Sequence, residues 1–112
     1  MDDHPSFRRF ARRLLEADGF VVLGEATDGA SALAATDALR PEVVLLDVLL
    51  PDTDGFAVAD ALAHEAQPPM VVLTSSREAA DYASRLERAS VMGFLAKSEL
   101  SGAALAALIE GQ

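Results

Sequence analysis

One apolar run that stops on a carboxylate constrains this chain more than any other feature. Residues 43–46 are Val-Val-Leu-Leu, and Asp47 follows them directly. Four apolar residues bounded by turn signals are typical of a strand buried on both faces, as in a parallel sheet. A charge at the end of such a strand is costly unless it meets solvent, a metal or an opposite charge. Chemistry in open parallel sheets gathers at the carboxyl ends of the strands, so Asp47 is the first candidate for a reactive group.

The rest of the sequence alternates between helical and extended patterns. The expected strands are residues 20–25, 43–47, 70–74 and 93–97. The expected helices begin at Pro5, Asp28, Asp54, Ser76 and Ser101. This alternation indicates βαβ units, and therefore an α/β fold with a parallel sheet and helices on both of its faces. With 112 residues and no linker or repeat, the sequence predicts one domain over residues 1–112.

Composition excludes several classes of function. A net charge of −9 disfavours nucleic-acid binding through the phosphate backbone, which needs a basic surface. No apolar stretch approaches the roughly 18 residues of a membrane span. There is no cysteine, so disulfides and thiolate metal sites are excluded, and the first residues do not resemble a secretory signal. We expect a cytoplasmic protein without direct contact to membranes.

Three predicted strands end on chemically distinct groups, which are Asp47, Thr74 and Lys97. Parallel strands bring these ends to one edge of the sheet, where a carboxylate, a hydroxyl and an ammonium would meet. Two more carboxylates, Asp2 and Asp3, stand just before the first helix. Several carboxylates at one edge repel each other unless a hard cation such as Mg²⁺ lies between them. The set suits phosphoryl transfer to Asp47, with the cations stabilising charge on the phosphoryl oxygens.

At these positions the sequence resembles the receiver domain of two-component response regulators, over nearly its whole length. Residues 2–5 (Asp-Asp-His-Pro) resemble the acidic pair of that family with the His-Pro extension of its LuxR-type branch. Residues 47–55 resemble the phosphoacceptor with its Pro-x-x-Asp-Gly loop. Residues 73–76 resemble the switch hydroxyl segment, and residues 93–97 the switch aromatic and lysine. The resemblance implies a flavodoxin-like (CheY-like), doubly wound parallel sheet.

The resemblance also implies a role for each site residue. Asp47 would accept phosphate from a histidine kinase. Asp3 would bind Mg²⁺ directly, Asp2 would support the ion through water, and the backbone carbonyl of Leu49 would be a further ligand. The chain would then be a switch with only self-directed phosphotransfer and dephosphorylation, and not a metabolic enzyme. Its output would be a downstream protein target or a homodimer.

Three further residues would respond to the phosphoryl group, which adds roughly −1.5 to −2 charge. Thr74 would hydrogen-bond a phosphoryl oxygen, Lys97 would pair with it, and Phe94 would rotate as Thr74 moves. Each motion is a shift between existing states. A plain core position is the alternative for Phe94. His4, next to Pro5, is interpreted as a helix-start residue rather than a ligand.

The sequence departs from the family at its beginning, because only Met1 precedes Asp2 where the family has an apolar strand. Three outcomes are open: residues 20–25 pair directly with 43–47, another chain fills the gap, or the natural protein starts further upstream. We favour the third, and expect a destabilised or dimeric domain whose Mg²⁺ site suffers because Asp2 and Asp3 hang on a free terminus.

Two rival functions remain. A phosphorylation-independent interaction module would follow if the absent strand leaves only a docking surface. A hydrolase of the phosphotransferase type is disfavoured, because residues 47–49 (Asp-Val-Leu) lack its second carboxylate. The LuxR-type branch usually continues into a helix-turn-helix domain. Since this sequence stops at Gln112, direct DNA binding by this chain is not expected.

Overall fold

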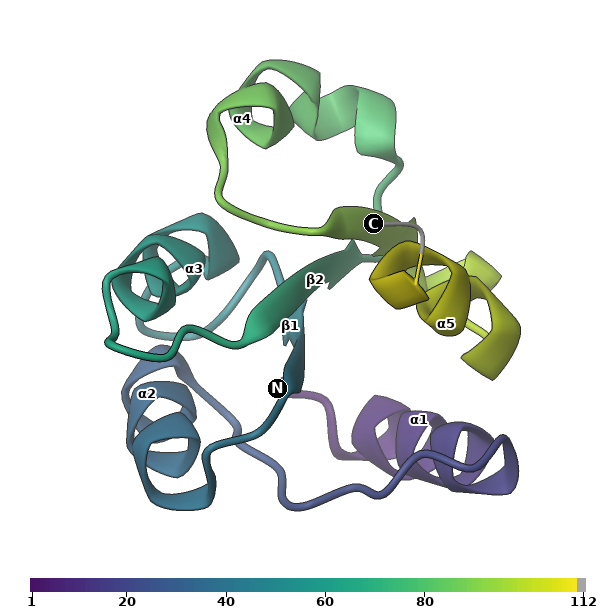
Figure 1. Ribbon diagram of the computed structural model, residues 1–112. Helices are drawn as coiled ribbons and strands as arrows, with labels where there is room; N and C mark the ends of the chain where they lie inside the picture. The colour runs from purple at the N-terminus through teal and green to yellow at the C-terminus, as the bar shows by residue number, and fades with distance from the viewer. Residues whose placement is uncertain (111–112) are drawn as a thin grey trace.

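The computed structural model describes residues 1–110, which form a three-stranded parallel sheet with helices on both faces (Figure 1). The strands are β1 (Val43–Asp47), β2 (Met70–Ser75) and β3 (Gly93–Ala96), in the spatial order β1-β2-β3. The helices are α1 (Pro5–Ala17), α2 (Gly29–Leu39), α3 (Gly55–Ala63), α4 (Ala83–Arg88) and α5 (Gly102–Glu110). Two 3₁₀ turns, η1 (Ala79–Tyr82) and η2 (Lys97–Glu99), precede α4 and α5.

Successive side chains of β1 point to opposite faces and feed two separate cores. Val44 and Leu46 pack on the side of α2 and α3. Val43 and Leu45 pack on the side of α1 and α5, together with Leu15 of α1. Leu46 is fully buried, as expected for an apolar strand covered on both faces. The predicted α/β sandwich is therefore present, and no helix within residues 1–110 is both long and apolar enough to cross a membrane.

Two predicted element boundaries are wrong. No helix begins at Ser76: η1 starts at Ala79, after its N-cap residue Glu78, and α4 follows from Ala83. The reason is local, because Ser75 Oγ accepts a hydrogen bond from the Arg77 N–H and holds the chain in a turn. Strand β3 ends one residue early, so Lys97 opens η2 instead of closing the strand.

The predicted strand at residues 20–25 is also absent, although the segment runs in extended form (Figure 1). Among the described residues it does not pair with β1, so the first of the three open outcomes, direct pairing, is not found in the structure. Instead Met1 lies against β1: its amino group donates to the Leu45 carbonyl at 2.7 Å, and the Asp47 N–H donates to the Met1 carbonyl at 3.0 Å. On the other side, the Asp2 N–H donates to the Ala26 carbonyl at 3.0 Å.

These bonds correct the expectation that the acidic pair hangs on a free terminus. Asp2 is 2% exposed and is held between residue 26 and β1, whereas Asp3 is exposed. The structure thus positions one of the two N-terminal carboxylates at the carboxyl end of the sheet. It does so with only two residues in place of a full strand.

Gly55 fixes the approach of α3 to the end of β1. A Cβ at this position would lie 2.4 Å from the Asp47 carbonyl oxygen, which is backbone and cannot swing away. Replacing Gly55 with alanine is therefore expected to lower the unfolding free energy by about 3 kcal/mol, and the thermal midpoint by about 10 °C or more. Thermal unfolding followed by circular dichroism measures this.

Gly24→Ala is the matched control for that substitution. A Cβ at Gly24 meets only Cδ1 of Leu39, the mobile end of a side chain, at 2.6 Å. Its effect should be a small fraction of that at Gly55. Equal midpoints for the two variants would contradict the assignment of a close backbone approach at Gly55.

Candidate functional site

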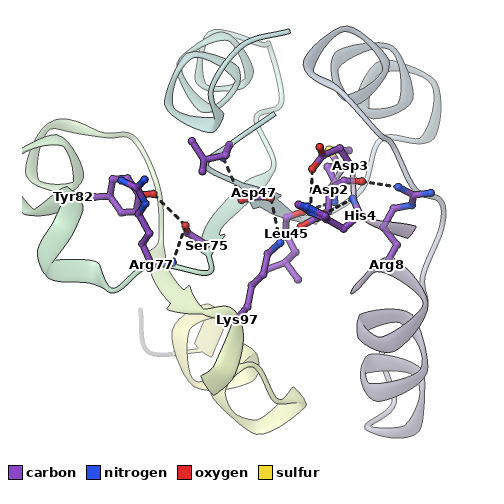
Figure 2. A network of polar contacts seen from close by, with 12 residues as sticks. Asp2, Asp3, His4, Arg8, Leu45, Asp47, Ser75, Arg77, Tyr82 and Lys97 are labelled. Carbon is purple, nitrogen blue, oxygen red and sulfur yellow. Dashed lines mark hydrogen bonds and ion pairs between the residues drawn. The ribbon is translucent and has the colours of Figure 1, made fainter. Parts of the chain in front are cut away.

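Three charged side chains from distant parts of the chain converge at the carboxyl end of β1 (Figure 2). Asp47 is 3% exposed at the last position of the strand. The Lys97 ammonium lies 3.3 Å from Asp47 Oδ2 and 2.6 Å from Asp2 Oδ2. The structure therefore brings Asp47 and Lys97 together, as predicted, and one member of the N-terminal acidic pair, Asp2, joins them. The ammonium also lies 4.4 Å from the ring centre of Phe7, which shields it from solvent on one side.

The three charges shift one another in directions set by burial and pairing. Burial raises the pKa of Asp47, and the neighbouring Asp2 carboxylate adds to that rise against the Leu49 N–H and Lys97. Burial also acts to raise the pKa of Asp2, but the Lys97 ammonium and the His4 N–H outweigh it and hold that pKa below its ordinary value. Burial works against the charge of Lys97, yet the two carboxylates raise its pKa. Asp47 is thus the carboxyl with the less stabilised charge.

The residues present fit a hard divalent cation. Asp2, Asp3, His4 and Asp47 each offer a ligand atom, and these atoms lie within 4.8 Å of one another. Carboxylate oxygens are what Mg²⁺ prefers. Leu49 also lies beside the site, since its N–H donates to Asp47 Oδ1 at 3.2 Å.

Sequence reasoning assigned His4 only to the start of a helix. His4 is indeed the N-cap residue of α1, without a side-chain capping bond. Its ring Nδ1 lies 3.0 Å from Asp2 Oδ1 and 3.1 Å from Asp3 Oδ1, so it also contacts both acids. The Asp-Asp-His order was the only signal that could have suggested this, and a ring contact within a turn cannot be inferred from order alone.

Thr74 stands beside Asp47 on the neighbouring strand, because the register of β1 and β2 pairs these two residues. The Thr74 hydroxyl is buried and has no hydrogen-bond partner among the described residues. An unpaired buried hydroxyl costs roughly 1–3 kcal/mol. Such a cost at the edge of a charged pocket is typical of a site that is completed by an incoming acceptor.

A series of side-chain contacts through Tyr82 links Ser75, the residue after Thr74, to β3 and α3. Ser75 Oγ and Tyr82 Oη lie 3.1 Å apart in a buried hydrogen bond. The Tyr82 ring is 5.8 Å from that of Phe94 and 5.9 Å from that of Phe56, centre to centre. Phe94 is half-buried and packs against the core. This position is compatible both with a plain core residue and with a switch residue that rotates.

Two carboxylates tie the loop after Asp47 to three helices: Asp54, which sequence reasoning placed at the start of a helix, and Asp52, to which it assigned no contact. Asp52 accepts hydrogen bonds from the N–H groups of Gly29 and Ala30 at 2.7 and 3.0 Å, at the start of α2. Asp54 caps α3 and pairs with Arg85 of α4 at 3.0 Å. Asp54 before Gly55 is a recognisable capping signal. The reach of Asp52 across 23 residues is visible only in the structure.

Comparison with known proteins agrees with this geometry. Residues 1–110 match the model of the response regulator receiver domain. NarL from Mycobacterium tuberculosis H37Rv is 40% identical over 97 residues, which are 86% of this chain and 45% of that protein. The positive alginate biosynthesis regulatory protein of Pseudomonas aeruginosa is 36% identical over 99 residues, which are 87% of this chain and 39% of that protein. The chain thus spans less than half the length of these relatives.

Solved structures give the same result. The signal receiver domain of NarL from Mycobacterium tuberculosis superposes with a TM-score of 0.82 at 38% identity, covering 99% of this chain and 93% of that one. A LuxR-family response regulator from Aurantimonas superposes with a TM-score of 0.85 at 27% identity, covering 98% and 79%. The predicted flavodoxin-like fold is confirmed, and this chain belongs to the receiver domain family of two-component response regulators.

Proposed function

We propose that Asp47 is the phosphoacceptor of this receiver domain. The supporting observation is the convergence of a buried Asp47, the Lys97 ammonium and the Asp2 carboxylate beside an unpartnered Thr74 hydroxyl. A buried hydroxyl without a partner calls for an explanation, and a phosphoryl oxygen on Asp47 would supply the acceptor. Phosphorylation-based switching is the function of the family, and these are the groups that could perform it here.

The chemistry is an in-line displacement on phosphorus. A carboxylate oxygen of Asp47 forms a new bond to phosphorus while the bond to the donor breaks, and the donor leaves with the electron pair. Burial raises the pKa of Asp47 in the metal-free chain, so a cation beside it would favour the ionised carboxylate that attacks phosphorus. Lys97 stabilises charge on the phosphoryl oxygens, and in doing so it exchanges one anionic partner for another.

Asp3 and Asp47 would hold Mg²⁺ together with the Leu49 carbonyl, and Asp2 would support the ion through water. When bound, the ion would neutralise charge on the phosphoryl oxygens. Asp2 already has Lys97 as its partner at 2.6 Å, whereas Asp3 is exposed and open to a new ligand. This division of labour between the two acids agrees with the roles implied by the family resemblance.

The response would start at Thr74. Its hydroxyl turns toward a phosphoryl oxygen on Asp47, and the backbone of Ser75 follows. The Ser75–Tyr82 hydrogen bond would couple this shift to η1, and the contact between the tilted rings of Tyr82 and Phe94 would couple it to β3. Phosphorylation would therefore shift the population of two arrangements of η1, α4 and β3, which a partner or second copy reads.

A histidine kinase is the donor that this proposal requires, and the chain acts as a switch rather than an enzyme on external substrates. Several of its relatives are named as transcriptional regulators. This chain carries a net charge of −9, and we assign DNA contact to no part of it. We also propose that residues 1–112 form a single receiver domain and that the protein is cytoplasmic.

The test is direct phosphorylation of the 112-residue chain. Incubation with Mg²⁺ and acetyl phosphate should add one phosphoryl group, which hydroxylamine removes, since it is an acyl phosphate. Peptide mapping by mass spectrometry should place the group on Asp47, and chelation of Mg²⁺ with EDTA should prevent labelling. A label on another residue, or none at all in folded protein, would favour the phosphorylation-independent interaction module.

A further inference from the structure

Phe7 is an aromatic residue in the first turn of α1 that packs with neither core. Its side chain is half-buried. Within residues 1–110 it belongs to neither of the two apolar clusters on the faces of the sheet. The face of its ring lies instead against Lys97, with the ammonium nitrogen 4.4 Å from the ring centre. The contact with the lysine therefore accounts for the position of this ring.

The Lys97 ammonium has three N–H donors, and carboxylates account for two of them. Asp2 Oδ2 lies 2.6 Å from the nitrogen, and Asp47 Oδ2 lies 3.3 Å from it. No third oxygen of residues 1–110 bonds this nitrogen. The face of an aromatic ring is electron-rich and attracts a cation. Phe7 thus completes the surroundings of the ammonium without adding a third negative charge.

The backbone of Lys97 does not fix the ammonium by itself. Lys97 opens η2, which is a turn of three residues, and a lysine side chain has a flexible four-carbon stem. The side chain is nevertheless only 16% exposed. Since the ring comes from α1 and the lysine follows β3, the contact restrains the ammonium from outside its own turn.

This restraint matters when a phosphoryl group arrives on Asp47. Asp2 and Asp47 share one ammonium, and Asp2 is the closer of the two. A phosphoryl oxygen needs the same ammonium and must draw it away from a carboxylate. A ring face attracts a cation without a directed hydrogen bond, so it allows the ammonium to turn toward the new oxygen while keeping it at the pocket.

We propose that Phe7 is a positioning residue, whose ring holds the Lys97 ammonium at the carboxyl end of β1, where a phosphoryl group on Asp47 would meet it. The inference deepens the proposed function and rests on it for any effect on labelling, whereas the contact itself exists without phosphorylation. Removing the ring face should slow phosphoryl transfer to Asp47 about fivefold, the size expected for one partly exposed contact of this kind.

The first measurement follows the end of the Lys97 side chain by NMR. Lys97 is the only lysine in the sequence, so isotope-labelled lysine gives a single ε-methylene signal. Protons over the face of an aromatic ring resonate upfield, and the same chain unfolded in urea supplies the reference. The upfield shift should be present in the parent chain and in Phe7→Tyr. It should be mostly lost in Phe7→Leu, which keeps an apolar side chain but has no ring.

The second measurement is the rate of labelling by acetyl phosphate with Mg²⁺. Phe7→Leu should be labelled about fivefold more slowly than the parent chain, and Phe7→Tyr should restore the rate. In a chain that already carries Lys97→Met, adding Phe7→Leu should change the rate by less than about twofold, because no ammonium is left to hold. A purely structural role of Phe7 would slow both chains by the same factor.

Phe10→Leu is the matched control on the same helix. The Phe10 ring lies 6.4 Å from the Phe7 ring, centre to centre, and Phe10 is 52% exposed. Among the described residues no cation lies over the Phe10 ring. This substitution should leave both the Lys97 signal and the labelling rate unchanged.

Three results would overturn the inference. The first is an ε-methylene shift that is the same in Phe7→Leu and in the parent chain. The second is equal slowing of labelling by Phe7→Leu with and without the Lys97 side chain. The third is an unfolded Phe7→Leu variant in circular dichroism, which would make Phe7 a core residue. If the folded parent chain is not labelled at all, the assignment of Asp47 fails instead, and the ε-methylene shift still decides whether Phe7 holds the ammonium.

Discussion

Replacing Asp47 with asparagine should abolish phosphorylation by acetyl phosphate while the domain stays folded. The amide cannot attack phosphorus, so we expect labelling to fall on the order of a thousandfold or more, to background. The asparagine oxygen can still accept from the Leu49 N–H. Burial raises the pKa of Asp47, which means that its ionised form destabilises the folded state. Removing the charge removes this cost, so the thermal midpoint should be at least that of the parent chain.

Asp60→Asn is the matched control for this prediction. Asp60 is an exposed acid on α3 and has no side-chain partner among the described residues. Labelling of this variant should equal that of the parent chain. If Asp47→Asn is still labelled, or if both variants lose the label together, Asp47 is not the phosphoacceptor.

Replacing Lys97 with methionine should produce the largest loss of stability from a single side chain at the site. The stem of the side chain is kept, but the buried Asp2 and Asp47 lose their shared cation. Removing one partner of a buried ion pair leaves an uncompensated charge. We expect the unfolding free energy at neutral pH, without divalent ions, to fall by about 3 kcal/mol.

The loss at Lys97→Met should depend on pH in a defined direction. The pKa of Asp47 is already raised in the folded chain, and without the ammonium it rises further. The folded state then binds a proton that the unfolded state releases, so stability increases as pH falls through the folded pKa toward the ordinary value of about 3.8. The difference from the parent chain should therefore shrink as pH is lowered from neutral toward that ordinary value, as measured by urea unfolding.

Arg9→Met separates this effect from a general change in net charge. Arg9 is exposed on α1 and makes none of the ion pairs within residues 1–110. It should change stability by less than about 0.5 kcal/mol at any pH in this range. A loss at Lys97→Met that grows as pH falls would contradict the burial of unpaired carboxylates as its cause.

Much of the architecture follows from the sequence because apolar runs leave few choices. Residues 43–46 and 70–73 can be buried only between layers of helices, and the intervening helices force the strands to be parallel. Once the strands are parallel, their carboxyl ends share an edge, so Asp47 lies near the residues at the carboxyl ends of β2 and β3. The convergence of Asp47 and Lys97 was predictable for this reason, although β3 ends one residue before the lysine.

Other features depend on contacts between distant segments, which a pattern does not encode. Residues 20–23 form an apolar run that is typical of a strand. A strand forms only where a neighbour bonds its backbone, however, and the described residues offer no such neighbour along this segment. Likewise, two adjacent aspartates look equivalent in sequence. The bond of the Asp2 N–H to Ala26 turns one carboxylate inward to Lys97 and leaves Asp3 outside.

The sequence by itself determined the class of fold and indicated a candidate nucleophile at a strand end and the kind of cation that would suit it, because these follow from periodicity and from the residue type at each strand end. Only the tertiary structure decided which acid pairs with Lys97 and which ring lies against it, where the His4 ring lies, and how Asp52 ties the loop to α2. Each of these is set by a backbone group or side chain that finds its partner across the fold, and such pairings are chosen by packing in three dimensions.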